Sequence, residues 1–145
     1  MDHDHYSDGY ILGILDRTRT IAMVGASPKT DRPSHVVMKF LCDRGYRVIP
    51  VNPRAAGETI LGEEVFSTLS DVPHDFDMVD IFRSSEAAAA IVDETVRLAA
   101  TRAIRTVWMQ LGVRDDEAAG RAQAAGLDVV MNRCPKIEWQ RLRGE

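Results

Sequence analysis

TIAMVGASPKTDRPS, residues 20–34, is the stretch of this sequence that decides the fold. Its apolar run, Ile21 to Val24, is unbroken, as in a strand that is buried on both faces. Gly25 ends the run, and a loop then leads to Ser34, which we expect to be the N-cap of a helix over 35–44. A strand, a glycine turn and a helix N-terminus in this order favour an anion site, because backbone N–H groups and the helix dipole face the ligand.

The glycine turn differs from the dinucleotide-binding fingerprint. G-x-G-x-x-G would need glycines two and five residues after Gly25, where this chain has Ser27 and Thr30. The longer loop contains Lys29 and Arg32, which add positive charge. The loop therefore indicates a phosphorylated ligand held differently from a nicotinamide dinucleotide. The alternative is an ordinary connection with a solvated lysine and arginine.

Length and composition indicate one domain, spanning residues 1–145, with a flexible tail over 1–7. The net charge of −4 argues against nucleic acid as the main partner, because no basic excess is present to neutralise phosphates. No apolar run approaches the ~20 residues of a membrane span. The polar N-terminus does not resemble a signal peptide, and Cys42 and Cys134 form no C-x-x-C motif. We therefore expect a cytoplasmic protein with no membrane partner.

Apolar runs alternate with amphipathic segments along the whole chain. The expected strands are Thr20–Val24, Arg47–Val51, Met78–Phe82, Arg105–Met109 and Leu127–Met131. The expected helices cover 8–17, 35–44, 85–101, 115–125 and 135–142, with Ser7 as the N-cap of the first and Ser84 or Ser85 as that of the third. This alternation predicts an α/β fold: a doubly wound parallel sheet of five main strands in the order 3-2-1-4-5, with helices on both faces.

In such a sheet, ligands bind outside the carboxyl ends of the strands. Three of the five strands are followed by an arginine, namely Arg54, Arg83 and Arg133, and we expect these guanidinium groups to converge on a polyanion. A dinucleotide site needs Asp or Glu after the second strand to hold the ribose hydroxyls, but this chain has Asn52, Pro53 and Arg54. A cation there suits a phosphorylated ribose, which NADP and coenzyme A both carry.

The sequence predicts no catalytic residue and no metal site. His35 and His74 have no visible nucleophile partner, and Asp77 and Asp80 lie three residues apart, on opposite faces of one strand. We interpret Asp80 as a structural group with satisfied hydrogen bonds rather than as a site residue. Cys134 is interpreted as a packed cysteine; a mixed disulfide with a thiol ligand is the alternative.

Six segments together resemble a known family: AMVGAS, RPS, VIPVNP, DMVDIFR, VWMQLGV and NRCPK. In this order and spacing they resemble the small stand-alone CoA-binding proteins of bacteria and archaea. These are similar to the CoA-binding domain of the succinyl-CoA synthetase alpha subunit. The resemblance covers about residues 15–137. It implies a Rossmann-type domain that holds coenzyme A across the carboxyl edge of the sheet.

The resemblance also implies the residues at the coenzyme, which follow four of the strands: Gly25, Ala26, Ser27, Arg32, Pro33, Ser34, Asn52, Pro53, Arg54, Phe82, Arg83, Ser84 and Gln110. By this likeness the first three face the phosphates and the next three flank them. Arg54 stands near the place where the ligase has a lysine. The segment from Phe82 to Ser84 lines the nucleotide pocket, and Gln110 belongs to the inner rim.

The sequence therefore predicts a non-catalytic module that binds the nucleotide cofactor coenzyme A or an acyl-CoA. The phosphohistidine of the ligase lies in a second domain, which we do not expect in this chain. Three alternatives stay open: an NADP-type oxidoreductase, a CoA-ligase subunit that needs a partner chain, and a regulatory module that senses the redox state of CoA through Cys134. A homodimer or a partner enzyme subunit is the protein partner left open.

Overall fold

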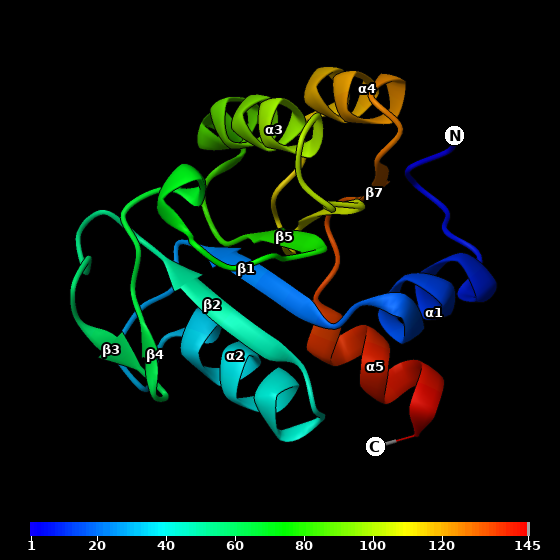
Figure 1. Ribbon diagram of the computed structural model, residues 1–145. Coiled ribbons are helices and arrows are strands. Elements are labelled where there is room, and N and C mark those ends of the chain that lie inside the picture. Colours follow the sequence, from blue (N-terminus) through cyan, green and yellow to red (C-terminus); the bar gives the residue numbers. More distant parts are fainter. Residues whose placement is uncertain (145) are drawn as a thin grey trace.

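The computed structural model of the protein describes residues 1–144. Its main sheet consists of five parallel strands: β1 (Thr20–Val24), β2 (Arg47–Val51), β5 (Met78–Ile81), β6 (Thr106–Met109) and β7 (Asp128–Val130). The helices are α1 (Asp8–Arg17), α2 (Pro33–Asp43), α3 (Ser85–Ala99), α4 (Asp116–Ala124) and α5 (Pro135–Arg143). The connection from β2 to β5 carries the hairpin of β3 (Thr59–Ile60) and β4 (Glu63–Glu64), and the short 3-10 helix η1 (Leu69–Asp71). The predicted α/β class is confirmed (Figure 1).

The strands lie in the order β2-β1-β5-β6-β7. Phe66 adds one parallel bridge to Val51 on the outer side of β2, where the Phe66 N–H donates to the Pro50 carbonyl at 3.1 Å. If the segment at Phe66 is counted as the third strand in chain order, the sheet has the predicted 3-2-1-4-5 order, and β7 is added as a sixth strand beside β6. The segment in third place differs from the prediction. Met78–Phe82 was expected beside β2, and the structure pairs Met78–Ile81 with the opposite edge of β1.

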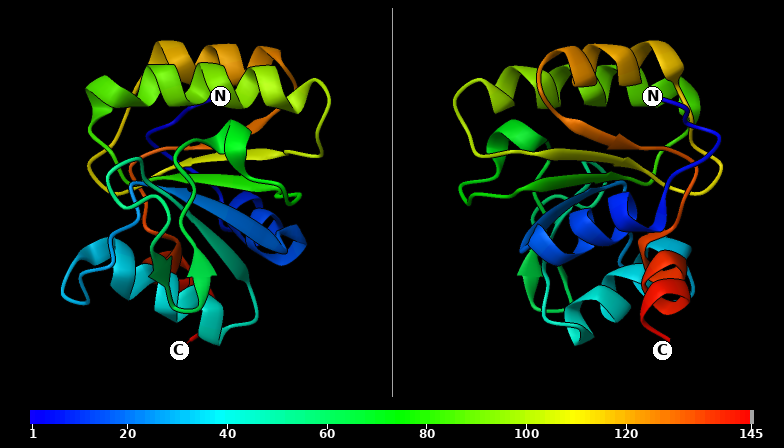
Figure 2. Two further views of the ribbon diagram at one scale, coloured as in Figure 1. Left: turned by 60° about the vertical axis from the view of Figure 1, so that its left-hand side comes forward. Right: turned by 90° about the vertical axis from the view of Figure 1, so that its right-hand side faces the viewer.

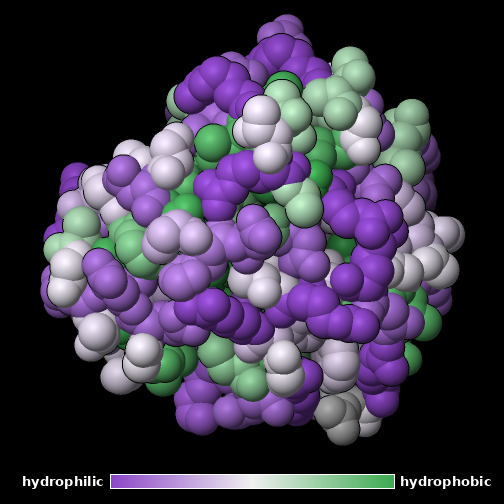
Figure 3. Space-filling model, viewed as in Figure 1, coloured by the Kyte–Doolittle hydropathy of each residue, from purple (hydrophilic) through white to green (hydrophobic). Residues whose placement is uncertain are grey.

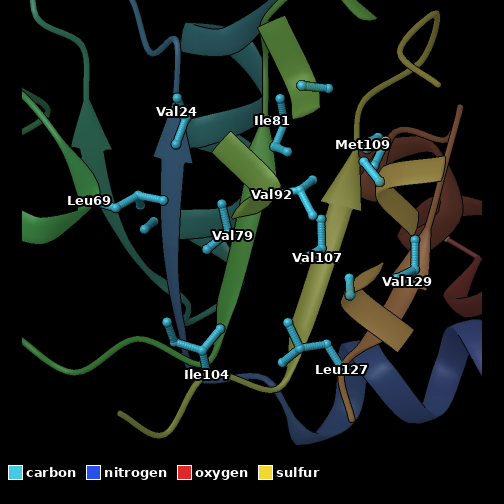
Figure 4. Close-up of a cluster of buried hydrophobic side chains, with 14 of the residues drawn as sticks. Val24, Leu69, Val79, Ile81, Val92, Ile104, Val107, Met109, Leu127 and Val129 are labelled. Carbon is cyan, nitrogen blue, oxygen red and sulfur yellow. The ribbon is translucent and has the colours of Figure 1, made fainter. Parts of the chain in front are cut away.

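Helices cover both faces of the sheet, as Figure 2 shows. α3, α4 and η1 lie on one side, and α1, α2 and α5 lie on the other. Successive residues of each strand point to opposite faces, so Val79 and Ile81 of β5 contact the first group while Met78 contacts the second. Figure 4 shows part of the first cluster, in which Val79 and Val107 of the sheet lie near Val92 of α3.

Side-chain caps set the start of several helices. Ser7 Oγ accepts a hydrogen bond from the Tyr10 N–H at 3.1 Å, and Ser84 Oγ accepts one from the Ala87 N–H at 3.3 Å, so both predicted caps are confirmed. The predicted cap at Ser34 is wrong. α2 begins earlier, at Pro33, because the fixed φ of proline is pre-organised for the first helical position.

Asp80 differs from its interpretation as a satisfied group. Its side chain is fully buried between Met23 and Trp108, its register partners in β1 and β6. Neither carboxylate oxygen has a hydrogen-bond partner within residues 1–144. Burial raises the pKa of Asp80 well above its usual value, because a low-dielectric surrounding disfavours the charged form. Asp80 is therefore a buried acid, with its pKa shifted toward the neutral form, in the layer that faces α1, α2 and α5.

The predicted flexible tail, residues 1–7, lies against the β7 edge of the sheet. The Met131 N–H donates to Tyr6 Oη at 2.9 Å, and the carboxylate of Asp4 pairs with Arg114 at 2.6 Å. These contacts join the tail to the end of β7 and to the residues before α4; its flexibility stays a prediction. In the described part of the chain, no helix is long and apolar enough to cross a bilayer.

Candidate functional site

A cavity of about 450 Å³ opens where β1, β2 and β5 end. We call it the cationic cavity, because three of its wall residues carry positive charge. Its walls come from the loop after β1, the start of α2, the loop after β2, and the first residue after β5: Gly25, Ser27, Pro28, Lys29, Arg32, Pro33, Ser34, Asn52, Arg54, Ala55, Glu58 and Phe82. The cavity therefore lies at the carboxyl edge of the sheet, where the fold class places ligands.

Gly25 makes the turn that begins this wall. Its φ of +92° lies in the left-handed region, which residues with a Cβ rarely adopt. A Cβ added to Gly25 would lie 2.2 Å from the backbone oxygen of Phe82. The backbone N–H of Gly25 donates to the Val51 carbonyl at 2.8 Å, and that of Phe82 donates to the Val24 carbonyl at 2.8 Å. Glycine is required here so that the exits of three neighbouring strands can lie against one another.

Two polar side chains hold the loops of the cavity in place. Asn52 Nδ2 donates to the Ala26 carbonyl at 2.8 Å, and its Oδ1 accepts from the Arg54 N–H at 3.0 Å. Ser34 is buried, and its Oγ accepts from the Ser27 N–H at 3.1 Å. Asn52 connects the exits of β1 and β2, while Ser34 closes the loop onto α2. The structure gives both side chains a positioning role.

The charge of the cavity wall is positive. Lys29, Arg32 and Arg54 are exposed, and within residues 1–144 their side chains form no ion pair. Arg47, by contrast, is held by Glu63 at 3.0 Å. The cavity wall contains one carboxylate, that of Glu58. Three cations without acidic partners around one hollow favour an anionic ligand, and charge-assisted hydrogen bonds to phosphate are among the stronger polar contacts in proteins.

A second hollow of about 830 Å³ adjoins the first, and we call it the apolar groove. Its walls come from α2, α5 and the exits of β5 and β6: Asp31, Pro33, Val36, Val37, Phe82, Arg83, Ser84, Gln110, Leu111, Val113, Cys134, Lys136, Ile137 and Gln140. Pro33 and Phe82 belong to the walls of both hollows. The two hollows therefore lie side by side, one with cationic walls and the other with largely apolar walls.

Most of the predicted site residues lie on these walls. Those at the cationic cavity are Gly25, Ser27, Arg32, Pro33, Ser34, Asn52, Arg54 and Phe82. Arg83, Ser84 and Gln110 lie at the apolar groove. Ala26 is buried and Pro53 is exposed, and neither belongs to either wall. Contact of any of these residues with a ligand stays a prediction.

The expected convergence of Arg54, Arg83 and Arg133 is wrong in part. Arg133 Nη1 pairs with the buried carboxylate of Glu138 at 2.8 Å, and its guanidinium lies 5.3 Å from the centre of the Tyr6 ring. These partners hold Arg133 away from both hollows. Arg54 lies at the cationic cavity and Arg83 at the apolar groove, so the charge that joins Arg54 comes instead from the loop after β1.

Sequence reasoning missed the groove side of α2 and α5. Val36 and Ile137 lie on helices about a hundred residues apart in the chain, and their closeness is a property of the tertiary fold. No clear signal was present in the sequence, because the exposure of Ile137 beside the buried Pro135 and Glu138 is known only from the structure. A single exposed apolar residue is ordinary, whereas several gathered around one hollow are typical of a ligand or partner contact.

The titratable side chains of the two walls include the carboxylates of Asp31 and Glu58 and the thiol of Cys134. Neither wall contains a histidine; His74 lies elsewhere, with its ring 6.3 Å from that of Phe66. Among residues 1–144, no cluster of His, Cys, Asp and Glu could hold a metal ion. Cys42 and Cys134 are both free thiols, and burial raises the pKa of Cys42 above its usual value. The arrangement is suited to holding an anionic, elongated molecule.

Comparison with known proteins identifies relatives over almost the whole chain. Residues 19–140 match the CoA binding domain family. The uncharacterized protein YneT of Bacillus subtilis is 35% identical over 131 residues, which cover 90% of this chain and 93% of YneT.

Solved structures agree with this match. A hypothetical protein from Pyrococcus horikoshii OT3 is 35% identical with a TM-score of 0.88, covering 99% of this chain and 97% of that one. A protein from Thermus thermophilus is 36% identical with a TM-score of 0.87, covering 94% of this chain and 99% of that one. By sequence and by fold, this chain belongs to the CoA-binding domain family.

Proposed function

We propose that this protein binds coenzyme A or an acyl-CoA as a non-catalytic module, with the ligand's phosphates in the cationic cavity. One observation carries the proposal: three unpaired cations surround a hollow at the carboxyl edge of the sheet, and an apolar groove adjoins that hollow at Pro33 and Phe82. Membership of the CoA-binding domain family supports coenzyme A as the ligand.

The two halves of the site match the two halves of coenzyme A. Its nucleotide carries a diphosphate and a phosphoryl group on the ribose, which suit the side chains of Lys29, Arg32 and Arg54. Its pantetheine arm is long and largely uncharged, and suits an elongated groove with few charges. The N-terminus of α2 lies beside the cationic cavity, and the positive end of its helix dipole favours the diphosphate.

The chemistry of the walls supports binding rather than turnover. A hydride transfer or a ligase reaction needs an acid–base or nucleophilic group placed at the ligand. The described walls contain no histidine, and within residues 1–144 the side chains of Asp31, Glu58 and Cys134 form no hydrogen bond with a second such group. The oxidoreductase and the ligase subunit remain as alternatives with different test results. The first predicts NADP turnover, and the second predicts activity only with a partner chain and a nucleoside triphosphate.

Calorimetry tests the proposal with four ligands: coenzyme A, NAD, NADP and adenosine 3′,5′-bisphosphate. We expect coenzyme A to bind more tightly than either nicotinamide dinucleotide, and mass spectrometry of ligand released from the purified protein to detect CoA or its thioesters. Equal or tighter binding of NADP would contradict the proposal.

A pair of arginine variants locates the site. Arg54→Ala removes one cation from the cavity and should weaken CoA binding about tenfold, as expected for one charge-assisted phosphate contact. Arg97→Ala is the matched control: Arg97 is exposed on α3, across the sheet, and its loss changes the net charge equally. Equal effects of the two substitutions would show that the cavity is not the phosphate site.

A further inference from the structure

We propose that the apolar groove holds the acyl-pantetheine arm of a CoA thioester, so that the protein prefers acyl-CoAs with an aliphatic chain over free coenzyme A. This inference rests on the proposed function and specifies its ligand class. Three features of the groove carry it: its continuity with the cationic cavity, one buried acceptor without a partner, and a set of exposed aliphatic side chains.

The continuity fixes the direction of the ligand. Pro33, at the start of α2, and Phe82, at the end of β5, form part of both walls. A molecule anchored by its phosphates among Lys29, Arg32 and Arg54 reaches the groove by passing these two residues. The groove, at about 830 Å³, is the larger hollow, and it has room for an arm with a substituent at its end.

Gln110 supplies the buried acceptor. Its side chain is only 7% exposed, and its Oε1 has no hydrogen-bond partner within the described residues. Its backbone is fixed, since its N–H donates to the Ile81 carbonyl at 3.2 Å and its carbonyl accepts from the Val113 N–H at 2.8 Å. A buried amide oxygen without a donor is costly, and a ligand N–H removes that cost. The pantetheine arm carries two amide N–H groups that can serve as this donor.

The walls of the groove carry a set of exposed aliphatic side chains. Val36 is 43% exposed, Leu111 59% and Ile137 48%, and all three line the groove. Only two other large hydrophobic residues of the described chain, Met1 and Leu61, are comparably exposed. On the face drawn in Figure 3, hydrophilic residues cover most of the surface. Free coenzyme A ends in a thiol, whereas an acyl chain adds methylene groups that remove such side chains from water.

A small ligand fits this groove better than a second copy of the chain. A stable interface needs about 800 Å² of buried surface from each partner, with a contiguous apolar centre. Here the exposed aliphatic groups stand around a hollow, with Asp31, Arg83 and Lys136 among them. This mixture of charged rim and apolar wall is typical of pockets for small molecules.

A chain-length series tests the inference by calorimetry on the full chain. The ligands are adenosine 3′,5′-bisphosphate, free CoA, and acetyl-, butyryl-, hexanoyl- and octanoyl-CoA. We expect affinity to rise about fourfold for each added methylene until the groove is filled. Equal affinity for CoA and all thioesters would overturn the inference and leave the proposed function standing. Failure of the bisphosphate and of every CoA compound to bind would overturn the proposed function.

Two further variants separate the roles of the wall residues. Ile137→Asn should flatten the chain-length dependence and leave bisphosphate binding unchanged, whereas Leu61→Asn, an equally exposed site outside the groove, should alter neither. Gln110→Leu should weaken CoA and all thioesters equally, by about fivefold, with no effect on the bisphosphate. Light scattering accompanies each titration. A dimer that Ile137→Asn dissociates, with no chain-length dependence in the parent, would assign the groove to a second copy and overturn the inference.

Discussion

Gly25 and Phe82 approach so closely that the position of a Cβ on Gly25 lies 2.2 Å from the carbonyl oxygen of Phe82. This contact joins the exits of β1 and β5 beneath the cationic cavity. The sequence suggests that a glycine at position 25 leaves room for a ligand phosphate. The structure shows that this glycine also leaves room for the backbone of Phe82. A larger residue at this position would therefore disturb the fold before any ligand arrived.

Gly25→Ala should destabilise the protein by about 3 kcal/mol, because the positive φ and the clash with Phe82 both act against a Cβ. Gly45→Ala is the matched control: Gly45 has a φ of +96°, and nothing lies within 4 Å of its added Cβ. It should lose only the conformational part, about 1 kcal/mol. Urea unfolding measures both free energies. Equal losses would show that the contact with Phe82 relaxes freely.

Asn52→Asp should weaken CoA binding by about tenfold or more. The substitution keeps the acceptor for the Arg54 N–H but replaces the donor to the Ala26 carbonyl, and it places a negative charge beside the cationic cavity. Asn132→Asp serves as a control, since the Asn132 side chain accepts from the Gly112 N–H at 2.7 Å and an aspartate keeps that bond. Calorimetry compares the two. An unchanged affinity in Asn52→Asp would remove Asn52 from the site.

Asp80→Asn should change how stability depends on pH. The folded-state pKa of Asp80 is raised above the unfolded value of 3.8. Above about pH 4, the Asp80 carboxyl should therefore ionise in the unfolded chain and stay protonated in the folded one. The parent therefore loses stability as the pH rises, with a slope toward about 1.4 kcal/mol per pH unit, until Asp80 ionises in the folded state as well.

The amide of Asp80→Asn has no such titration. Its stability relative to the parent should therefore increase from pH 4 to pH 7 in urea unfolding. Asp77→Asn is the contrast: the Asp77 carboxylate accepts from the Arg19 and Thr20 N–H groups at 2.9 and 2.8 Å, and its loss should not reproduce this rise. A pH-independent difference between the parent and Asp80→Asn would mean that Asp80 is charged in the folded protein.

Cys134→Ser tests the redox alternative. The Cys134 side chain is buried at the wall of the apolar groove. If the thiol is only packed, CoA should be retained equally through gel filtration with and without a reductant, in the parent and in the variant alike. Retention that needs oxidising conditions in the parent, and that the serine abolishes, would instead favour a module that senses CoA redox state. Cys42→Ser, at a half-buried thiol outside the groove, is the control.

The local elements could be read from the sequence because local forces decide them. The apolar runs and their glycine stops place all five strands to within a residue or two, and the caps at Ser7 and Ser84 follow from hydroxyl chemistry alone. The N-cap predicted at Ser34 was wrong because the fixed φ of Pro33 suits the first helical position, so α2 begins one residue before Ser34.

The remaining errors concern contacts between distant segments. The segment beside β2 is a single bridge at Phe66, too short to give a strand pattern, so Met78–Phe82 was assigned to its place. The pairing of Arg133 with Glu138 depends on the direction of α5 relative to the end of β7. The apolar groove needs α2 and α5 side by side, and no periodicity within either helix specifies that arrangement.

The passage between the two hollows has a consequence for how a ligand would be admitted. The ring of Pro33 fixes its backbone on one side, and on the other side Phe82 donates its N–H to the Val24 carbonyl of β1 and lies against Gly25. Such a gateway is already rigid in the empty protein, so association would not have to immobilise it.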